Sequence, residues 1–243
     1  MNLIIDIGNT QAKVAIFKDT EIIVQRIFPE IMICDVEQLL TLYPDINTGI
    51  LSSTAVRDES LIQYLSQTLP AFIELTGSIA LPFINCYKTP DTLGTDRIAA
   101  VAGASMLYPG YNILVIDAGS AIKYDFINDK NEYLGGNISP GLEMRFKALH
   151  TFTGNLPFLN KNEKAAYRGD DTQSAIISGV QEGILHEMKG YIQTFNKTQD
   201  NGRVVLTGGD AHFFADKLKS PIFVNQNLVL IGLNRILQFH AVK

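Results

Sequence analysis

Residues 2–17 read NLIIDIGNTQAKVAIF, and this stretch decides the fold because two apolar runs flank a polar centre. The centre contains Asp6, Gly8, Asn9 and Thr10. Because Gly and Asn tolerate the positive φ of a tight turn, the pattern predicts a β-hairpin. Backbone N–H groups of such a turn, with the Thr10 hydroxyl, are suited to bind phosphate oxygens, and Asp6 is suited to hold Mg²⁺. An ordinary hairpin with a polar tip is the alternative.

The same pattern recurs about half a chain later. Residues 112–126 read NILVIDAGSAIKYDF, in which Asp117, Gly119 and Ser120 again follow an aliphatic run and precede an alternating strand. Because such a repeat indicates two similar halves, we expect two domains of related structure. The two turns are then expected to face one another across a cleft and to bind one phosphate chain from both sides.

Composition limits the classes of function. The chain has 243 residues, 46% of them hydrophobic and 19% charged, which is enough for one large or two ordinary domains with a core. A net charge of −5 argues against nucleic acid bound through a broad basic face. Only two cysteines occur, without a CxxC pair, so neither a zinc site nor a disulfide framework is expected. No long apolar segment or signal peptide is found, and we expect a cytoplasmic protein without a membrane partner.

The remaining pattern alternates strands and helices. Further strands are predicted at residues 21–28, 48–53, 71–75, 132–138, 203–206 and 222–224. Helices are predicted at residues 36–43, 58–69, 98–107, 142–149, 172–195, 211–218 and 227–239. The order predicts an α/β protein with mixed sheets and helices on their faces. Residues 154–171 contain Pro157 and several Lys and Asn, which is typical of a mobile loop.

Residues 87–97, YKTPDTLGTDR, lead into a helix rich in small residues. Thr95 is expected to cap this helix and Asp96 to lie in its first turn. Asp96 is a candidate base for a substrate hydroxyl, and Arg97 a candidate anion-binding group beside it. The alternative is that Asp96 only complements the helix dipole, and this stretch alone favours that alternative.

Two glycine-rich connections also join a strand to a helix. They are residues 135–141, GGNISPG, and residues 207–210, TGGD. Each is suited to a close backbone approach to a phosphate, substrate or nucleotide, or simply to a change of chain direction. Neither a P-loop nor a G-x-G-x-x-G fingerprint occurs, which argues against those two nucleotide-binding folds.

Taken in order and at this spacing, the five motifs resemble those of type III pantothenate kinases, over nearly the whole chain. The resemblance implies a member of the acetate and sugar kinase/Hsp70/actin superfamily, with two ribonuclease-H-like domains and a nucleotide cleft between them. The expected domains are residues 1–111 and 112–243. The implied activity is ATP-dependent phosphorylation of pantothenate to 4'-phosphopantothenate, the first step of coenzyme A synthesis.

The resemblance also implies roles for single residues. The ATP-phosphate loop is expected to comprise Asp6, Ile7, Gly8, Asn9, Thr10, Gln11, Ala12 and Lys13. Pantothenate is expected to contact Tyr87, Gly94, Thr95, Asp96 and Arg97, with Asp96 as catalytic base. Mg²⁺ is expected with ATP, held through its phosphates and Asp6.

Three further positions carry expectations from the resemblance. Asp117 matches the ligand of a monovalent cation, K⁺ or NH₄⁺. Ser120 stands where the family commonly has threonine at an ATP contact, which retains the hydroxyl and loses the methyl group. Thr172 matches a threonine that reaches pantothenate from the neighbouring subunit of a homodimer. Ile231 stands where the family frequently has an acidic residue.

The small and aliphatic residues of the helix at 172–195 also suit close packing against a second subunit, although packing inside its own domain is the commoner arrangement. Two alternatives to the implied activity stay open. One is another kinase or phosphatase of the superfamily, acting on a sugar, acetate or polyphosphate. The other is a non-enzymatic regulator that senses a nucleotide.

Overall fold

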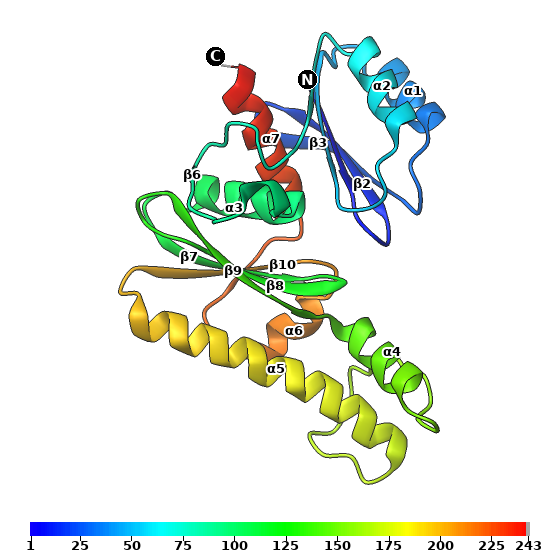
Figure 1. Ribbon diagram of the computed structural model, residues 1–243, viewed down its shortest axis with the longest axis vertical. Helices are drawn as coiled ribbons and strands as arrows, with labels where there is room; N and C mark the ends of the chain where they lie inside the picture. The colour runs from blue at the N-terminus through cyan, green and yellow to red at the C-terminus, as the bar shows by residue number, and fades with distance from the viewer. Residues whose placement is uncertain (242–243) are drawn as a thin grey trace. The chain divides into compact units, whose positions relative to one another are not determined.

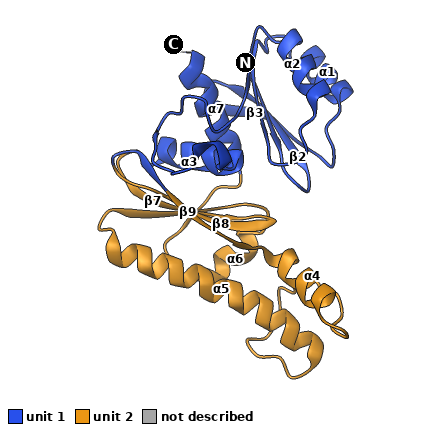
Figure 2. Ribbon diagram, viewed as in Figure 1, with its two compact units in different colours: residues 1–109, 130–134, 227–243 blue, residues 110–129, 135–226 orange. Residues whose placement is uncertain are grey.

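A computed structural model describes residues 1–241, which form two compact units (Figures 1 and 2). The first unit contains Met1–Pro109, Lys130–Leu134 and the C-terminal segment that begins at Asn227, and the second contains Gly110–Asp129 and Gly135–Gln226. The two units are not separated at a single point of the chain, because the C-terminal helix packs with the N-terminal sheet. The division into domains at residues 111 and 112 stays a prediction.

The first unit is built on a five-stranded mixed sheet of order β3-β2-β1-β4-β5. Its strands are β1 (Asn2–Ile7), β2 (Ala12–Lys18), β3 (Glu21–Phe28), β4 (Thr48–Ser53) and β5 (Ala71–Glu74). β1, β2 and β3 pair antiparallel, whereas β4 lies parallel to both β1 and β5. Helices α1 (Ile33–Leu42) and α2 (Glu59–Thr68) bury their apolar stripes with Leu3, Ile5, Val14 and Ile16 in one core.

Helices α3 (Thr95–Leu107) and α7 (Leu228–Ala241) also belong to this unit and pack closely together. A Cβ added at Gly232 would lie 1.7 Å from the carbonyl oxygen of Ala99, and one at Gly103 would lie 2.3 Å from that of Leu228. Any larger side chain would force these helices apart. The glycine contact therefore fixes α3, whose first turn carries Asp96.

The second sheet has the order β11-β10-β7-β8-β9-β6. Its strands are β6 (Ile84–Asn85), β7 (Asn112–Ala118), β8 (Ala121–Ile127), β9 (Glu132–Pro140), β10 (Gly202–Thr207) and β11 (Phe223–Val224). β7 and β8 are antiparallel, and β10 is parallel to β7 and β11. The first residues of β9 belong to the first unit and pair with β6.

Three helices complete the second unit, α4 (Leu142–Phe152), α5 (Thr172–Thr198) and α6 (Ala211–Leu218). The long α5 runs beneath the sheet in Figure 1 and buries Ile184, Met188 and Ile192 in a core shared with β7, β8 and α6. The prediction of an α/β protein with two mixed sheets flanked by helices is confirmed. No helix among residues 1–241 is long and apolar enough to cross a bilayer.

The first hairpin forms as predicted, but the tight turn expected at its tip is wrong. β1 and β2 do form the hairpin, but neither Gly8 nor Asn9 has a positive φ. A four-residue connection, residues 8–11, reverses the chain instead and is closed by a hydrogen bond from the Gly8 N–H to the Gln11 carbonyl at 3.0 Å. A longer connection spreads the reversal over more residues, so none of them needs the left-handed region.

Candidate active site

Asp96 lies in the first turn of α3, as predicted, and a polar row connects its helix to the end of β1. Asp6 stands beside Ser52 in the parallel register of β1 and β4. The Ser52 hydroxyl donates to the Thr95 hydroxyl at 3.1 Å, and the Thr95 hydroxyl donates to the Ser53 carbonyl at 3.2 Å. The two candidate carboxylates of the first unit are thereby tied to one edge of one sheet.

The predicted cap at Thr95 is wrong. The N-cap of α3 is Gly94, and Thr95 is the first helical residue, with its hydroxyl committed to β4. The Asp96 carboxylate accepts a hydrogen bond from the Arg97 N–H at 2.8 Å, and a Cβ at Gly94 would lie 2.7 Å from the same oxygen. Gly94 therefore leaves room for the Asp96 side chain at the helix start, where the helix dipole favours a carboxylate.

Arg97 is only 4% exposed and lies against two tyrosine rings. Its guanidinium carbon is 5.5 Å from the ring centre of Tyr87 and 6.0 Å from that of Tyr133, and these rings stack at 6.1 Å. Cation–π contacts of this kind hold a guanidinium in a fixed position. The sequence argument missed Tyr133, which comes from β9, because no local pattern links that strand to residues 87–97.

The second hairpin carries Asp117, which is 8% exposed, at the end of β7. Lys123 is its cross-strand partner on β8, and the Lys123 ammonium lies 2.9 Å from Oδ2 of Asp117. Thr207 on β10 is the partner on the other side. A row of Thr207, Asp117 and Lys123 thus crosses the polar end of this sheet. The sequence argument missed Lys123, although the alternation of β8 places Lys123 on the face opposite Ile122 and Tyr124, beside Asp117.

Both glycine-rich connections support the second hairpin. Gly208 has a φ of 96°, and a Cβ there would lie 2.5 Å from Oδ1 of Asp117. The Gly141 N–H donates to the Ser120 carbonyl at 3.2 Å, and a Cβ at Gly136 would lie 1.9 Å from the Tyr124 carbonyl. These glycines permit close packing of backbone against backbone. A contact of the same segments with a ligand stays a prediction.

Behind this hairpin lies a polar network that the sequence argument missed. The buried Tyr124 donates to Glu187 at 2.9 Å, and Arg145 donates to the other carboxylate oxygen at 2.5 Å and to the Ser139 hydroxyl at 2.8 Å. Burial, and next the hydrogen bond to Glu187, raise the pKa of Tyr124. Burial alone would raise the pKa of Glu187, but the hydrogen bonds from Arg145, Ser139 and Tyr124 outweigh it and lower that pKa.

Thr172 is the first residue of α5. Asp171 is the N-cap of this helix, and its carboxylate accepts a hydrogen bond from the Ser174 N–H at 2.9 Å. That hydrogen bond lowers the pKa of Asp171. Thr172 also lines a pocket of about 740 Å³ between α4 and α5. The other lining residues are Arg145 and a set of small or aliphatic residues: Ala148, Leu149, Leu156, Ala175, Ile176, Gly179 and Val180.

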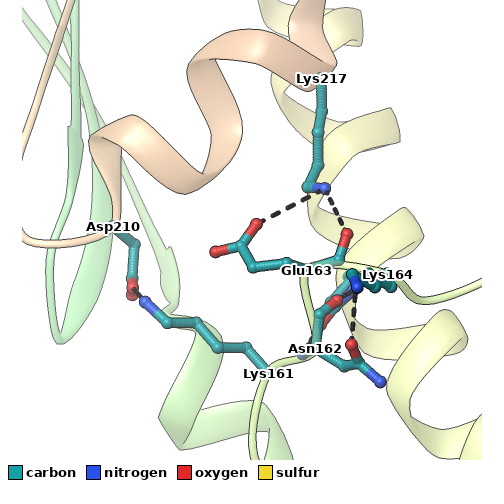
Figure 3. Close-up of polar contacts among 7 residues, drawn as sticks. Lys161, Asn162, Glu163, Lys164, Asp210 and Lys217 are labelled. Atoms are coloured by element: carbon teal, nitrogen blue, oxygen red, sulfur yellow. Dashed lines mark hydrogen bonds and ion pairs between the residues drawn. The ribbon is translucent and has the colours of Figure 1, made fainter.

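The loop at residues 154–171 is tethered to the rest of the second unit (Figure 3). Lys161 forms an ion pair with Asp210 at 2.6 Å, just after the Gly208-Gly209 pair, and Lys217 of α6 donates to the Glu163 carbonyl at 3.2 Å. The Asn162 N–H donates to Gln181 of α5 at 2.7 Å. These contacts attach the middle of the loop to two helices. The mobility of the loop stays a prediction.

The predicted residues thus fall into two groups. The first unit holds the β1–β2 loop, Tyr87 and the start of α3, and the second holds Asp117, Ser120 and Thr172. Within residues 1–241, no group of three or more His, Cys, Asp or Glu side chains is placed to bind a metal ion.

Comparison with known proteins places this arrangement in a family. A family model described as type III pantothenate kinase matches residues 2–194. Proteins named type III pantothenate kinase are 44% identical in Christiangramia forsetii, over 99% of both chains, and 45% identical in Phocaeicola vulgatus, over 99% of both chains. The corresponding protein of Bacteroides fragilis is 44% identical over 99% of this chain and 98% of its own.

Solved structures agree on the fold. A Baf family protein from Campylobacter jejuni aligns with a TM-score of 0.64 and 24% identity, covering 99% of this chain and all of that one. A dehydratase activator from Clostridium difficile, solved with bound ADPNP, aligns with a TM-score of 0.51 and 15% identity over 98% of this chain and 93% of its own. At such identities the likeness concerns the fold alone. The sequence matches carry the assignment, and the chain belongs to the type III pantothenate kinase family.

Proposed function

We propose that this protein is a pantothenate kinase, which transfers a phosphoryl group from ATP to the terminal hydroxyl of pantothenate in the first step of coenzyme A synthesis. One observation carries the proposal beyond family membership. Asp6, Ser52 and Thr95 form a continuous row that ends beside Asp96. The candidate carboxylate for Mg²⁺ and the candidate base are therefore attached to the same end of one sheet.

Phosphoryl transfer needs positioning and charge neutralisation more than covalent chemistry. We assign ATP-phosphate binding to the β1–β2 loop, residues 8–11, with Lys13 at the start of β2, and a further ATP contact to the Ser120 hydroxyl. Asp6 would hold Mg²⁺, which neutralises phosphate charge in such reactions. Its place at the end of β1, half-buried beside Ser52, fits an ion that keeps most of its ligands from phosphates and water.

Asp96 would orient the hydroxyl of pantothenate and accept its proton. Arg97 would bind the carboxylate of the same substrate, because its guanidinium is fixed by Tyr87 and Tyr133 and is held out of bulk water. Charge-assisted hydrogen bonds to a carboxylate are stronger where water is excluded. Tyr87, Gly94 and Thr95 would complete the pantothenate contacts.

The test is a coupled assay of ATP with pantothenate on the wild type and on Asp96→Asn. Because Asn is nearly isosteric and cannot take the proton, turnover should fall by about 10²-fold or more while the fold is kept. Near-normal turnover of Asp96→Asn would assign Asp96 to the helix start only. Absence of pantothenate phosphorylation by the wild type, with turnover of a sugar or acetate, would favour another kinase of the superfamily. No turnover of ATP with any acceptor would favour a nucleotide-sensing regulator.

A homodimer, with Thr172 contributed to the partner's substrate site, is the second part of this proposal. The helix α5 supports it, because the predicted stripe divides into two faces: Ile176, Val180 and Ile184 are buried in the unit's own core, whereas Ala175, Gly179 and Gly183 stay exposed. A Cβ at Gly179 would meet no atom within 4 Å. An exposed small-residue face suits close approach of the same helix from a second copy.

Gly190, on the same helix, tests this arrangement as a matched control, since a Cβ there also meets nothing within 4 Å. In a monomer both Gly179→Leu and Gly190→Leu would be tolerated. If α5 packs against its copy through Gly179, only Gly179→Leu should convert the dimer to monomers in light scattering. A wild-type monomer at working concentration would reject the proposal. The cytoplasmic location stays a prediction.

A further inference from the structure

The Asp117 site combines a buried carboxylate with an ammonium group from the same chain. We propose that Lys123 supplies at Asp117 the positive charge that K⁺ or NH₄⁺ is expected to supply, so that turnover of this protein needs no monovalent cation. The inference rests on the proposed kinase function for its activity readout. It goes beyond that function, because it assigns a role to a side chain outside the expected site.

The sheet register makes this contact a built-in feature. Asp117 and Lys123 are direct partners across the antiparallel strands β7 and β8, so both side chains leave the sheet on the same face. The core of the unit takes the opposite face, with Ile116, Ile122 and Tyr124. The Lys123 side chain therefore cannot turn into the core without a change of register, and it stays beside the Asp117 carboxylate.

The two carboxylate oxygens of Asp117 have different neighbours: one lies beside the Lys123 ammonium, and the other lies beside glycine backbone. Oδ2 accepts from the Lys123 ammonium at 2.9 Å. Oδ1 lies against Gly208 and Gly119, where an added Cβ would be 2.5 Å and 3.4 Å away. The side chains of Asp117 and Lys123 are 11% and 16% exposed, so the pair is largely shielded from water.

The chemistry of the ammonium matches the expected ion. A lysine ammonium carries one positive charge and three N–H donors, and so differs from NH₄⁺ mainly by its covalent tether. A tethered group is present at its site whatever the salt composition, whereas a free ion must be bound from solution. An Asp117 whose charge is already compensated has little remaining attraction for a second cation. The expected K⁺ or NH₄⁺ therefore does not fit this carboxylate in this chain.

An ion pair with a purely structural role would make a different prediction. Loss of Lys123 would then weaken the fold, and no cation would take its place. If Lys123 stands in for the ion, its removal should instead create a site that K⁺ or NH₄⁺ can fill. The appearance of a new, specific cation requirement is the property that separates the two roles.

The experiment compares the wild type with Lys123→Met, which keeps the length of the side chain and removes its charge, and with Lys123→Arg, which keeps the charge. Lys18→Met removes an exposed lysine at the end of β2 and serves as control. ATP-dependent pantothenate phosphorylation is measured in sodium buffer with and without K⁺ or NH₄⁺. Wild type, Lys123→Arg and Lys18→Met should be equally active in all three salts. Lys123→Met should lose about tenfold or more in sodium alone, which is below the roughly 10²–10³-fold cost of losing a group that stabilises the transition state directly, and it should recover in K⁺ or NH₄⁺.

Cation binding is read separately by the ²⁰⁵Tl⁺ NMR signal, with K⁺ as competitor, which needs no turnover. Lys123→Met should show a K⁺-displaceable Tl⁺ site that the wild type lacks. A wild type that requires K⁺ or binds Tl⁺ specifically would overturn the inference, and so would a folded Lys123→Met that neither K⁺ nor NH₄⁺ restores. If no form phosphorylates pantothenate in any salt, the proposed function fails, while the Tl⁺ measurement still decides the role of Lys123.

Discussion

The two hairpins of this chain, β1–β2 and β7–β8, begin from the same pattern and differ in how they treat its carboxylate. Each places an aspartate at the end of its first strand and a lysine opposite, Asp6 with Lys13 and Asp117 with Lys123. Asp6 and Lys13 are both half-buried, whereas Asp117 is 8% exposed and forms an ion pair with Lys123 at 2.9 Å. The two aspartates of this shared pattern therefore differ in how deeply they are buried.

Burial explains the difference. A buried carboxylate is costly unless an opposite charge lies beside it, so the Asp117 site must be compensated whether or not a ligand is bound. Asp6 is half-buried and keeps part of its side chain in contact with solvent, so its charge carries a smaller desolvation cost. The comparison predicts that loss of the Asp6 carboxylate acts mainly on turnover, whereas loss of the Asp117 carboxylate acts first on stability.

The largest expected effect is that of Asp6→Asn. Losing the carboxylate that holds Mg²⁺ at the phosphates should lower turnover by about 10²–10³-fold, the usual cost of removing one electrostatic group that stabilises a transition state. The unfolding free energy should fall less than it does in Asp117→Asn, because Asp6 is less deeply buried. The coupled assay and urea unfolding measure both. Asp200→Asn, in an exposed turn, is the control, and normal turnover of Asp6→Asn would remove the first hairpin from the site.

Asp117→Asn should have the largest effect on stability. It leaves the Lys123 ammonium in a largely buried position without its carboxylate, which costs about 3 kcal/mol of unfolding free energy on the scale for breaking buried pairs. The double variant Asp117→Asn/Lys123→Met removes both charges and should recover part of that loss. Urea unfolding of all three forms measures it. A loss no larger than that of Asp6→Asn would mean that the two hairpins do not differ in this way.

Most of the fold could be predicted from the sequence because its signals are local. Alternation and apolar runs predicted both hairpins, and helical spacing predicted α2 and α5. The contacts that were missed join distant segments: Tyr133 with Tyr87, and α7 with α3 through Gly232 and Gly103. No local pattern encodes which strands become neighbours, so these contacts depend on the packed tertiary structure.

The candidate site shows the same distinction between local sequence signals and contacts of distant segments. Asp96 in a first helical turn and the polar tip of the first hairpin follow from residue types at short spacing. The ion pair of Asp117 and Lys123 could have been predicted by extending the hairpin register by one more pair, since cross-strand partners follow once the turn is fixed. Ser52, which joins Asp6 to Thr95, could not, because its role requires the parallel pairing of β1 with β4.

The core-facing sides of the two hairpins also differ. The substitution Glu187→Gln tests the energetic contribution of this difference. β2 buries Val14 and Ile16, whereas β8 buries Tyr124, which donates to Glu187. Because hydrogen bonds lower the pKa of Glu187 in the folded state, its ionised form contributes stability that is present above the unfolded-state pKa and is lost as pH falls through the folded pKa.

At pH 7, Glu187→Gln should therefore lower the unfolding free energy by about 2 kcal/mol, the scale of hydrogen bonds to a charged group. The difference from the wild type should narrow as the pH falls below the unfolded-state pKa, about 4.3 for a glutamate, and towards the lower pKa of the folded state. Urea unfolding at several pH values measures it, and Glu182→Gln on the same helix is the control. A difference that does not change with pH would show that the charge of Glu187 contributes nothing.

The most direct test of the division of roles between the hairpins is Mn²⁺ binding, followed by electron paramagnetic resonance in the presence of a non-hydrolysable ATP analogue. We expect Asp6→Asn to weaken Mn²⁺–nucleotide binding by about tenfold or more, because even residues that only support a metal ligand change the affinity by about 10–100-fold. Asp117→Asn, at a temperature where it is folded, should bind Mn²⁺ with the wild-type affinity. Loss of Mn²⁺ binding in Asp117→Asn with normal binding in Asp6→Asn would contradict the account.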